Sequence, residues 1–303
     1  MALAAVLSAM REIILDFDGL PSTFDARKAQ YAESCPGLTE PELEDLAKIL
    51  PERWQVYTHS IFSGEASVLR NHLPVTLALL EYNYPKDNAK GFDLYDLVRR
   101  SHKVRPWRDN ITETLVHNFK IFLEEDMGPA LSKISALQDM ATLELTTLQI
   151  KRDSQRFFKH EDSQLISTIA GMSVDRILGG SYKISTLARF VRFDRDVLAF
   201  RKQYWAMDRK LDGSSPVKRE VFAVGGRSND NTVNWEEINR FEMDLLSGAS
   251  REVSYRIEDW AEGFGSNQTS SQPEEELFVS FLSRLLKLSA AGVIQLELPT
   301  TNQ

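Results

Sequence analysis

The sequence contains a single cysteine, Cys35, among 303 residues, so no disulfide bond forms within the chain. Such cysteine usage is typical of a reducing compartment, and we expect a cytoplasmic protein. No run of about 18 apolar residues occurs, so we predict no membrane-spanning helix and no membrane partner. Residues 1–10 are apolar but lack a basic leading segment, which argues against a signal peptide.

Sequence signatures of catalysis are also missing. No Gly-x-Ser-x-Gly elbow occurs, and no glycine-rich phosphate loop ends in Lys-Ser or Lys-Thr. The few histidines show no zinc-ligand spacing, and His72 is more typical of a helix end than of a metal ligand. Cys35 stands beside Pro36 in a loop, where a thiol is more often inert than nucleophilic. We therefore expect no catalytic residue, no metal ligand and no cofactor in this chain.

Basic residues are scarce in the last quarter of the chain. The formal net charge of the whole chain is −8. Residues 216–303 hold eight Lys and Arg against fourteen Asp and Glu, so about six of the excess negative charges lie there. This balance disfavours nucleic acid, because affinity for DNA depends on neutralising phosphates with Lys and Arg.

The pattern of residues 1–155 predicts an all-α bundle. Thr39 followed by Pro41 and Glu42 is a helix start that combines a capping hydroxyl, an early proline and an early carboxylate. Further helices are expected near residues 52–72, 75–82, 92–98, 110–124 and 129–149. The apolar face of the second helix is predicted to follow spacings of three, four and seven residues. Its expected members are Trp54, Tyr57, Ile61, Val68 and Leu69.

Residues 156–215 are expected to connect two domains. Residues 182–193 are rich in β-branched and aromatic residues and predict an extended segment. Residues 196–207 predict a helix, and the polar stretch 208–216 predicts a linker.

Residues 216–303 predict a small α+β domain. Strands are expected at 218–224 and 232–235, with a turn of Gly, Ser, Asn and Asp between them. Asn234 is expected to cap a helix that ends near Gly248, and helices at 253–263 and from Pro273 to Gly292 follow. A final strand is expected at 293–298. The fold class predicted for the chain is therefore mainly α with a small β component, ending in a winged-helix-like domain.

A winged-helix order fits two kinds of ligand, DNA and an extended peptide. The acidic charge disfavours DNA, whereas an exposed strand edge beside a helix can accept a peptide as an extra strand. We expect the edge at residues 232–235, together with the third helix, to bind a peptide. The predicted peptide-binding residues are Arg219, Val221, Phe222, Val224, Thr232, Val233, Asn234, Trp235, Phe278 and Leu282. Packing in the core explains Phe222, Phe278 and Leu282 among them equally well.

Several segments resemble the partner proteins of multinuclear non-haem iron oxidative enzymes. Residues 53–57, Arg-Trp-Gln-Val-Tyr, with Ser60 resemble that family's Arg-Phe-x-Val-Tyr-Arg-x-Asn motif. Residues 73–76, 118–123, 137–145, 187–191 and 197–201 resemble its later motifs in the same order. Thr58 and His59 depart from the first motif, and Lys183-Ile184 stands where the family often has His-Pro.

The resemblance implies a non-catalytic subunit. Such proteins form a heterodimer with a TIM-barrel iron oxygenase, bind a ribosomally made precursor peptide and present its cysteine to the iron of that enzyme. The residues expected to contact the enzyme are Arg53, Tyr57, His59 and Ser60. The length of the chain most resembles the partner type that serves 3-thiaglutamate biosynthesis. The alternatives are a winged-helix transcription regulator and, less favoured, a hydrolase that uses Cys35 or a histidine.

Overall fold

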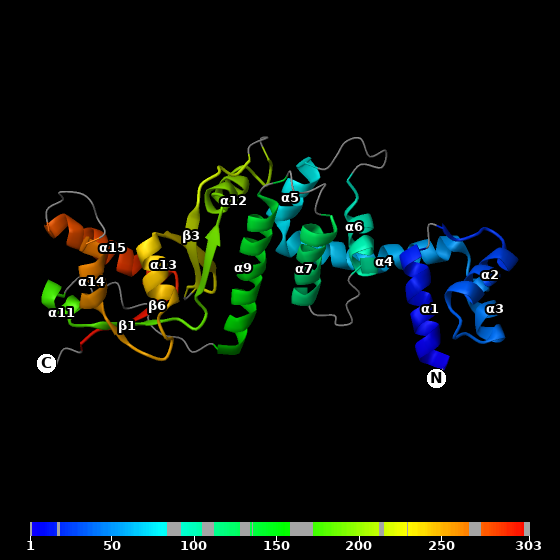
Figure 1. Cartoon of the computed structure of the whole chain (residues 1–303), viewed down its shortest axis with the longest axis horizontal. Coiled ribbons are helices and arrows are strands. Elements are labelled where there is room, and N and C mark those ends of the chain that lie inside the picture. The colour runs from blue at the N-terminus through cyan, green and yellow to red at the C-terminus, as the bar shows by residue number, and fades with distance from the viewer. Residues whose placement is uncertain are drawn as a thin grey trace. The chain divides into compact units, whose positions relative to one another are not determined.

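The computed structural model describes residues 2–16, 19–83, 92–104, 112–127, 134, 136–157, 172–211, 215–228, 230–266 and 274–299. The chain divides into two compact units, Met1–Ser135 and Ala136–Gln303. The described residues are mainly helical and form two small three-stranded antiparallel sheets, both in the second unit (Figure 1). None of the described helices is long and apolar enough to cross a membrane.

The first unit is helical, as expected. Its elements are α1 (Ala2–Asp16), α2 (Phe24–Ser34), α3 (Glu40–Lys48), α4 (Pro51–His72), α5 (Pro74–Asn83), α6 (Leu94–Val104), α7 (Thr112–Ile121) and the π-helix η2 (Phe122–Asp126). The predicted start of α3 is confirmed. The Glu42 carboxylate accepts hydrogen bonds of 2.7 Å from both the backbone N–H and the hydroxyl of Thr39, which satisfies a donor at the helix entry.

Helix α4 buries Trp54 and Leu69 as predicted, but not Tyr57 and Ile61. Its buried residues advance in steps of three or four and are Trp54, Thr58, Phe62, Ala66 and Leu69. Tyr57 and Ile61, expected on the apolar face, are 52% and 44% exposed. The prediction followed the large side chains, but α4 packs its other side against α1, α5, α6 and α7.

The second unit begins with a long helix and contains all the strands. Its helices are α9 (Leu137–Phe157), α11 (Val174–Leu178), α12 (Val197–Ala206), α13 (Arg240–Ser247), α14 (Ile257–Ser266) and α15 (Glu274–Ala290). The strands are β1 (Ser181–Ile184), β2 (Arg189–Phe193), β3 (Val221–Arg227), β4 (Val233–Ile238), β5 (Tyr255–Arg256) and β6 (Ile294–Glu297). Helix α9 was expected in the first domain and to end at residue 149. It extends to Phe157 and belongs to the second unit.

The two sheets have the strand orders β5-β1-β6 and β2-β3-β4. The extended segment expected at 182–193 is therefore two strands that join different sheets. Strand β1 pairs with both β5 and β6, and β2 pairs with β3. The boundary expected between residues 215 and 216 falls inside the second unit, because each sheet takes one strand from before it and two from after it.

The β2-β3-β4 sheet is covered on both faces. Helix α9 contacts all three strands on one face, and Figure 1 shows β3 between α9 and α13. The opposite face contributes Val224 and Ile238 to a core cluster built from α13, α14, α15 and the other sheet. At Gly226 a Cβ would lie 2.4 Å from the Ala291 carbonyl oxygen, so this close approach of the turn after α15 to β3 requires glycine.

The helix that Asn234 was expected to cap begins later than predicted. Residues 233–238 form strand β4, and α13 starts at Arg240 with Asn239 as its cap, so the prediction that Asn234 caps it is wrong. The Asn239 side chain accepts a 2.8 Å hydrogen bond from the Glu242 N–H, and the Asn239 N–H donates to the Glu242 carboxylate at 3.0 Å. This reciprocal pair fixes the point at which strand becomes helix.

Candidate functional site

The hydrogen-bond pattern of the β3–β4 hairpin shows which backbone groups of β4 face outward. The Ser228 N–H donates to the Thr232 carbonyl at 3.0 Å, so these residues form the first bonded pair. Bonded and non-bonded pairs alternate along an antiparallel ladder. The register therefore directs the backbone groups of Asn234, Glu236 and Ile238 toward β3.

The backbone groups of Val233, Trp235 and Glu237 point away from β3. Strand β4 pairs only with β3 among the described strands, so these groups form the open edge of the sheet. Within the described residues, the only hydrogen bond that reaches this edge comes from Arg284 on α15, whose guanidinium donates to the Glu237 carbonyl at 2.6 Å. The edge from Val233 to the Glu237 N–H is thus available for pairing with another strand.

Arg284 ties this edge to the helices. Its guanidinium also donates two hydrogen bonds, of 2.7 and 2.9 Å, to the buried carboxylate of Glu242 on α13. Such a bidentate pair holds α15 beside the end of β4. The sequence predictions missed Arg284, although it is the only arginine in the apolar stretch from residue 277 to 288.

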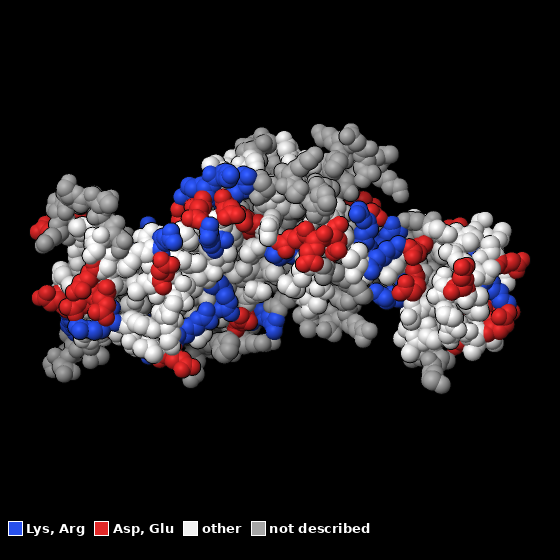
Figure 2. Space-filling view, viewed as in Figure 1, with Lys and Arg blue, Asp and Glu red and all other residues white. Residues whose placement is uncertain are grey.

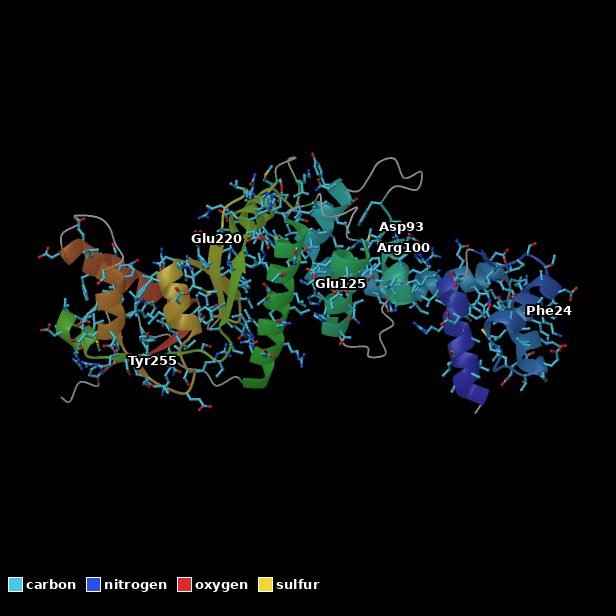
Figure 3. All side chains as sticks on the ribbon, viewed as in Figure 1. Phe24, Asp93, Arg100, Glu125, Glu220 and Tyr255 are labelled. Carbon is cyan, nitrogen blue, oxygen red and sulfur yellow. The ribbon has the colours of Figure 1, made fainter. Side chains whose placement is uncertain are left out.

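A second ion network borders the same end of β4. Arg219 donates to both carboxylate oxygens of Glu237, at 2.5 and 3.0 Å, and to Asp196 at 2.5 Å. These carboxylates raise the pKa of Arg219 above its ordinary value. Burial raises the pKa of Asp196, but the bonds from Arg219 and the Ala199 N–H outweigh it and leave that pKa lowered. Arg219, a predicted peptide contact, is therefore already engaged. Glu220 directly precedes β3 in the chain (Figure 3).

The hairpin tip at the other end of β4 has a fixed shape. Asn231 adopts a positive φ of 67°, which Asn tolerates better than most residues. The Asp230 carboxylate accepts hydrogen bonds from the Ser228 hydroxyl at 2.5 Å and the Thr232 hydroxyl at 2.7 Å. These bonds lower the pKa of Asp230 to about 2. The tip therefore sets the register of the edge strand.

Two of the ten predicted peptide contacts, Val233 and Trp235, have backbone groups at the open edge. The backbone groups of Thr232 and Asn234 instead face β3. The Thr232 hydroxyl is held by Asp230, and the Asn234 amide donates to the Ser228 hydroxyl at 2.9 Å. Val233 is half-buried and its backbone faces outward, so it is the most accessible pairing position among them.

The side chains of Trp235 and of the remaining apolar contacts serve the core. The side chains of Val221, Val224 and Trp235 are buried, so a peptide could reach Trp235 only through its backbone. The Trp235 indole N–H donates to the Thr147 hydroxyl on α9 at 3.0 Å. The remaining side chains pack, partly buried, against the core cluster beneath α15. They are Phe222, Phe278 and Leu282.

The expected enzyme contacts divide between two sides of α4. Tyr57 is exposed, and Arg53 and Ser60 lie on the same side of the helix because they are four and three residues from it. His59 faces another way, and its ring lies 5.1 Å from that of Tyr95 on α6. Two exposed apolar residues that the prediction did not assign to the interface, Val56 and Ile61, complete the Tyr57 side.

No metal-binding or nucleophilic constellation occurs among the described residues. Within those ranges, no group of three His, Cys, Asp or Glu side chains is placed to hold a metal ion. Burial, followed by the charge of Glu12, raises the pKa of the Cys35 thiol. A raised pKa keeps a thiol protonated and therefore weakly nucleophilic.

No known protein-family model matches this chain, and no curated protein matches it. The open edge of β4 and the exposed side of α4 are therefore interpreted from their own geometry. The first can pair with an extended backbone, and the second combines apolar, aromatic and arginine side chains as protein interfaces do.

Proposed function

We propose that this protein is the non-catalytic, substrate-recruiting subunit of an iron-dependent oxygenase that modifies a ribosomally made precursor peptide. The second unit binds the precursor as an added strand on β4, and the first unit contacts the TIM-barrel enzyme. The precursor's cysteine is then presented to iron held by the enzyme, while this chain supplies binding and positioning.

The observation that carries the proposal is the open edge of β4. Three antiparallel strands, β2, β3 and β4, are followed by α13, α14 and α15, an order that supports a winged-helix-like recognition domain. Strand addition uses backbone hydrogen bonds for affinity and neighbouring pockets for specificity. The outward backbone groups of Val233 and Trp235 offer the hydrogen bonds.

The exposed side of α4 supports the pairing with an enzyme. Aromatic residues and arginine are enriched at interface cores, and Arg53, Tyr57 and the neighbouring Val56 and Ile61 supply that chemistry. His59, which packs against Tyr95, is better explained as a support for α4 than as a direct contact.

The narrower part of the proposal concerns the product. The sequence resemblance favours a system that makes 3-thiaglutamate by excising the β-carbon of a C-terminal cysteine. This assignment rests on chain length and motif order. It requires a cognate precursor that ends in a cysteine.

The direct test uses the chain together with an oxygenase and a short cysteine-containing precursor encoded beside it. We expect a 1:1 heterodimer with the enzyme by size-exclusion chromatography with light scattering. Hydrogen exchange should show that the precursor slows exchange at the Val233, Trp235 and Glu237 amides, which face outward, more than at Asn234 and Glu236. Precursor binding that leaves the outward amides unchanged would overturn strand addition at β4. Salt-sensitive binding of duplex DNA without any precursor binding would favour a transcription regulator instead.

A further inference from the structure

Helix α12 and the turn after it carry exposed basic residues around an exposed tryptophan. Trp205 is 40% exposed, and the Arg209 guanidinium lies 4.9 Å above the centre of its ring. Lys202 and Lys210 are exposed on the same helix and turn. Figure 2 shows Lys and Arg side chains gathered over α12. We call Lys202, Trp205, Arg209 and Lys210 the α12 surface.

The turn that forms this surface is strained. Asp208 and Arg209 have positive φ angles of 51° and 64°, although neither is glycine. A left-handed conformation is unfavourable for residues that carry a Cβ. The Arg209 N–H donates to the Tyr204 carbonyl at 3.0 Å, and this return of the chain places the guanidinium over the indole. Neither side chain is buried by the arrangement, so core packing does not account for it.

The cations of the α12 surface form no direct ion pair within the described part of the chain. Lys202 is near enough to Asp196 to lower the pKa of that carboxyl group, but Arg209 and Lys210 have no carboxylate partner there, whereas Arg192 pairs with Glu220 and Arg219 with Glu237. Unpaired cations are unexpected on a chain whose net charge is −8. Three of them around an indole create a local positive field that attracts anions.

We propose that the α12 surface binds an acidic, extended segment of a partner protein. Carboxylates match the guanidinium fork of Arg209 and the two ammonium groups, and the indole offers a flat apolar platform for the segment's own side chains. Tryptophan and arginine are the residue types that most often dominate binding energy at interfaces.

A short acidic peptide fits this surface better than a nucleic acid. Nucleic acid is a long polyanion whose affinity depends on many cations, whereas this surface has three cations with Asp208 among them. A peptide with a few carboxylates matches that number of cations. The proposal does not rest on the proposed function, because this surface binds an acidic segment whether or not a strand pairs with β4.

The test uses the full chain at low salt and fluorescence anisotropy of a dye-labelled peptide that carries three glutamates. We expect binding that also changes the emission of Trp205. Arg209→Glu should weaken it at least tenfold, as removal of a central interface residue does. Trp205→Leu should weaken it as well while leaving the helical circular dichroism unchanged. The matched control is Arg100→Glu on α6, the same charge reversal at another exposed arginine, which should leave binding unaffected.

Three outcomes would overturn the proposal. The first is an absence of glutamate-peptide binding to the wild-type chain. The second is an equal loss in Arg209→Glu and Arg100→Glu, which would mean that only overall charge matters. The third is tighter binding of a single-stranded oligonucleotide with the same number of charges, which would assign the surface to nucleic acid.

Discussion

Val233→Pro tests the open edge of β4 most directly. Proline removes one backbone N–H, and at this position that N–H faces outward rather than toward β3. One net hydrogen bond contributes about 0.5–1.5 kcal/mol. Since about 1.4 kcal/mol corresponds to a tenfold change in Kd, we expect precursor binding to weaken about 2- to 12-fold. The ladder between β3 and β4 loses no bond, so the melting temperature should stay close to that of the wild type.

Two variants control this experiment, which is read by isothermal titration calorimetry and thermal unfolding. Val233→Ala keeps the N–H and should bind the precursor nearly as the wild type does. Asn234→Pro removes an N–H that points toward β3, so it should lower stability as well as binding. The reasoning is refuted if Val233→Pro binds with unchanged Kd, or if it unfolds as easily as Asn234→Pro does.

Three further predictions concern stability. Gly292→Ala should lower the free energy of unfolding by about 2–4 kcal/mol, as measured by urea titration. Gly292 has a φ of +71°, and a Cβ at this position would lie 1.8 Å from the Arg227 carbonyl oxygen in β3. Gly265→Ala, with no atom within 4 Å of its Cβ, should not be destabilising; equal losses at both glycines would contradict this. Trp54→Ala should cost about 3–5 kcal/mol and Tyr57→Ala about 0.5 kcal/mol or less, and the reverse order would disprove the assigned faces of α4. The folded-state pKa of Asp230 is lowered to about 2, so its stabilisation is present above the unfolded pKa of about 4 and is lost as pH falls through 2. Asp230→Ala should therefore lose less stability than the wild type between pH 5 and pH 2 in denaturation curves, and an identical loss would contradict the assignment.

Local signals in the sequence predicted where several helices begin. Pro74 opens α5, and the Thr39–Glu42 pair opens α3, because the chemistry of a helix start lies within four residues. The same chemistry was present at Asn239 with Glu242 three residues later. The prediction chose Asn234 instead, since the alternation of residues 233–238 was too short to separate strand from helix.

The faces of elements were harder to predict than their existence. Tyr57 and Trp54 are both large and are three residues apart, yet one is exposed and the other buried. Which side of a helix is covered depends on the neighbours it packs against, and these are distant in sequence. The same reason explains Trp235, whose side chain is buried by α9, an element expected in another domain.

Local sequence patterns did not predict which distant strands pair with each other. Residues 182–193 looked like one extended segment, but the few residues after Ile184 pass from one sheet to the other. The composition of residues 182–193 does not predict which strands pair with β1, because register and burial across the whole unit select antiparallel partners. The open edge of β4 was predicted in outline, whereas the role of Arg284 at its end required the structure.

The placement of β1 between β5 and β6 also has a consequence for synthesis on the ribosome. Ser181 in β1 and its partner Glu297 in β6 are 116 residues apart. At about 5–20 residues per second, β1 leaves the ribosome about 6–23 s before β6 is made. During that interval β5 can pair with β1, but the other edge of β1 stays open and Ile184 lacks its β6 partner Ile294. Nascent chains halted before residue 294 should therefore recruit chaperones at β1.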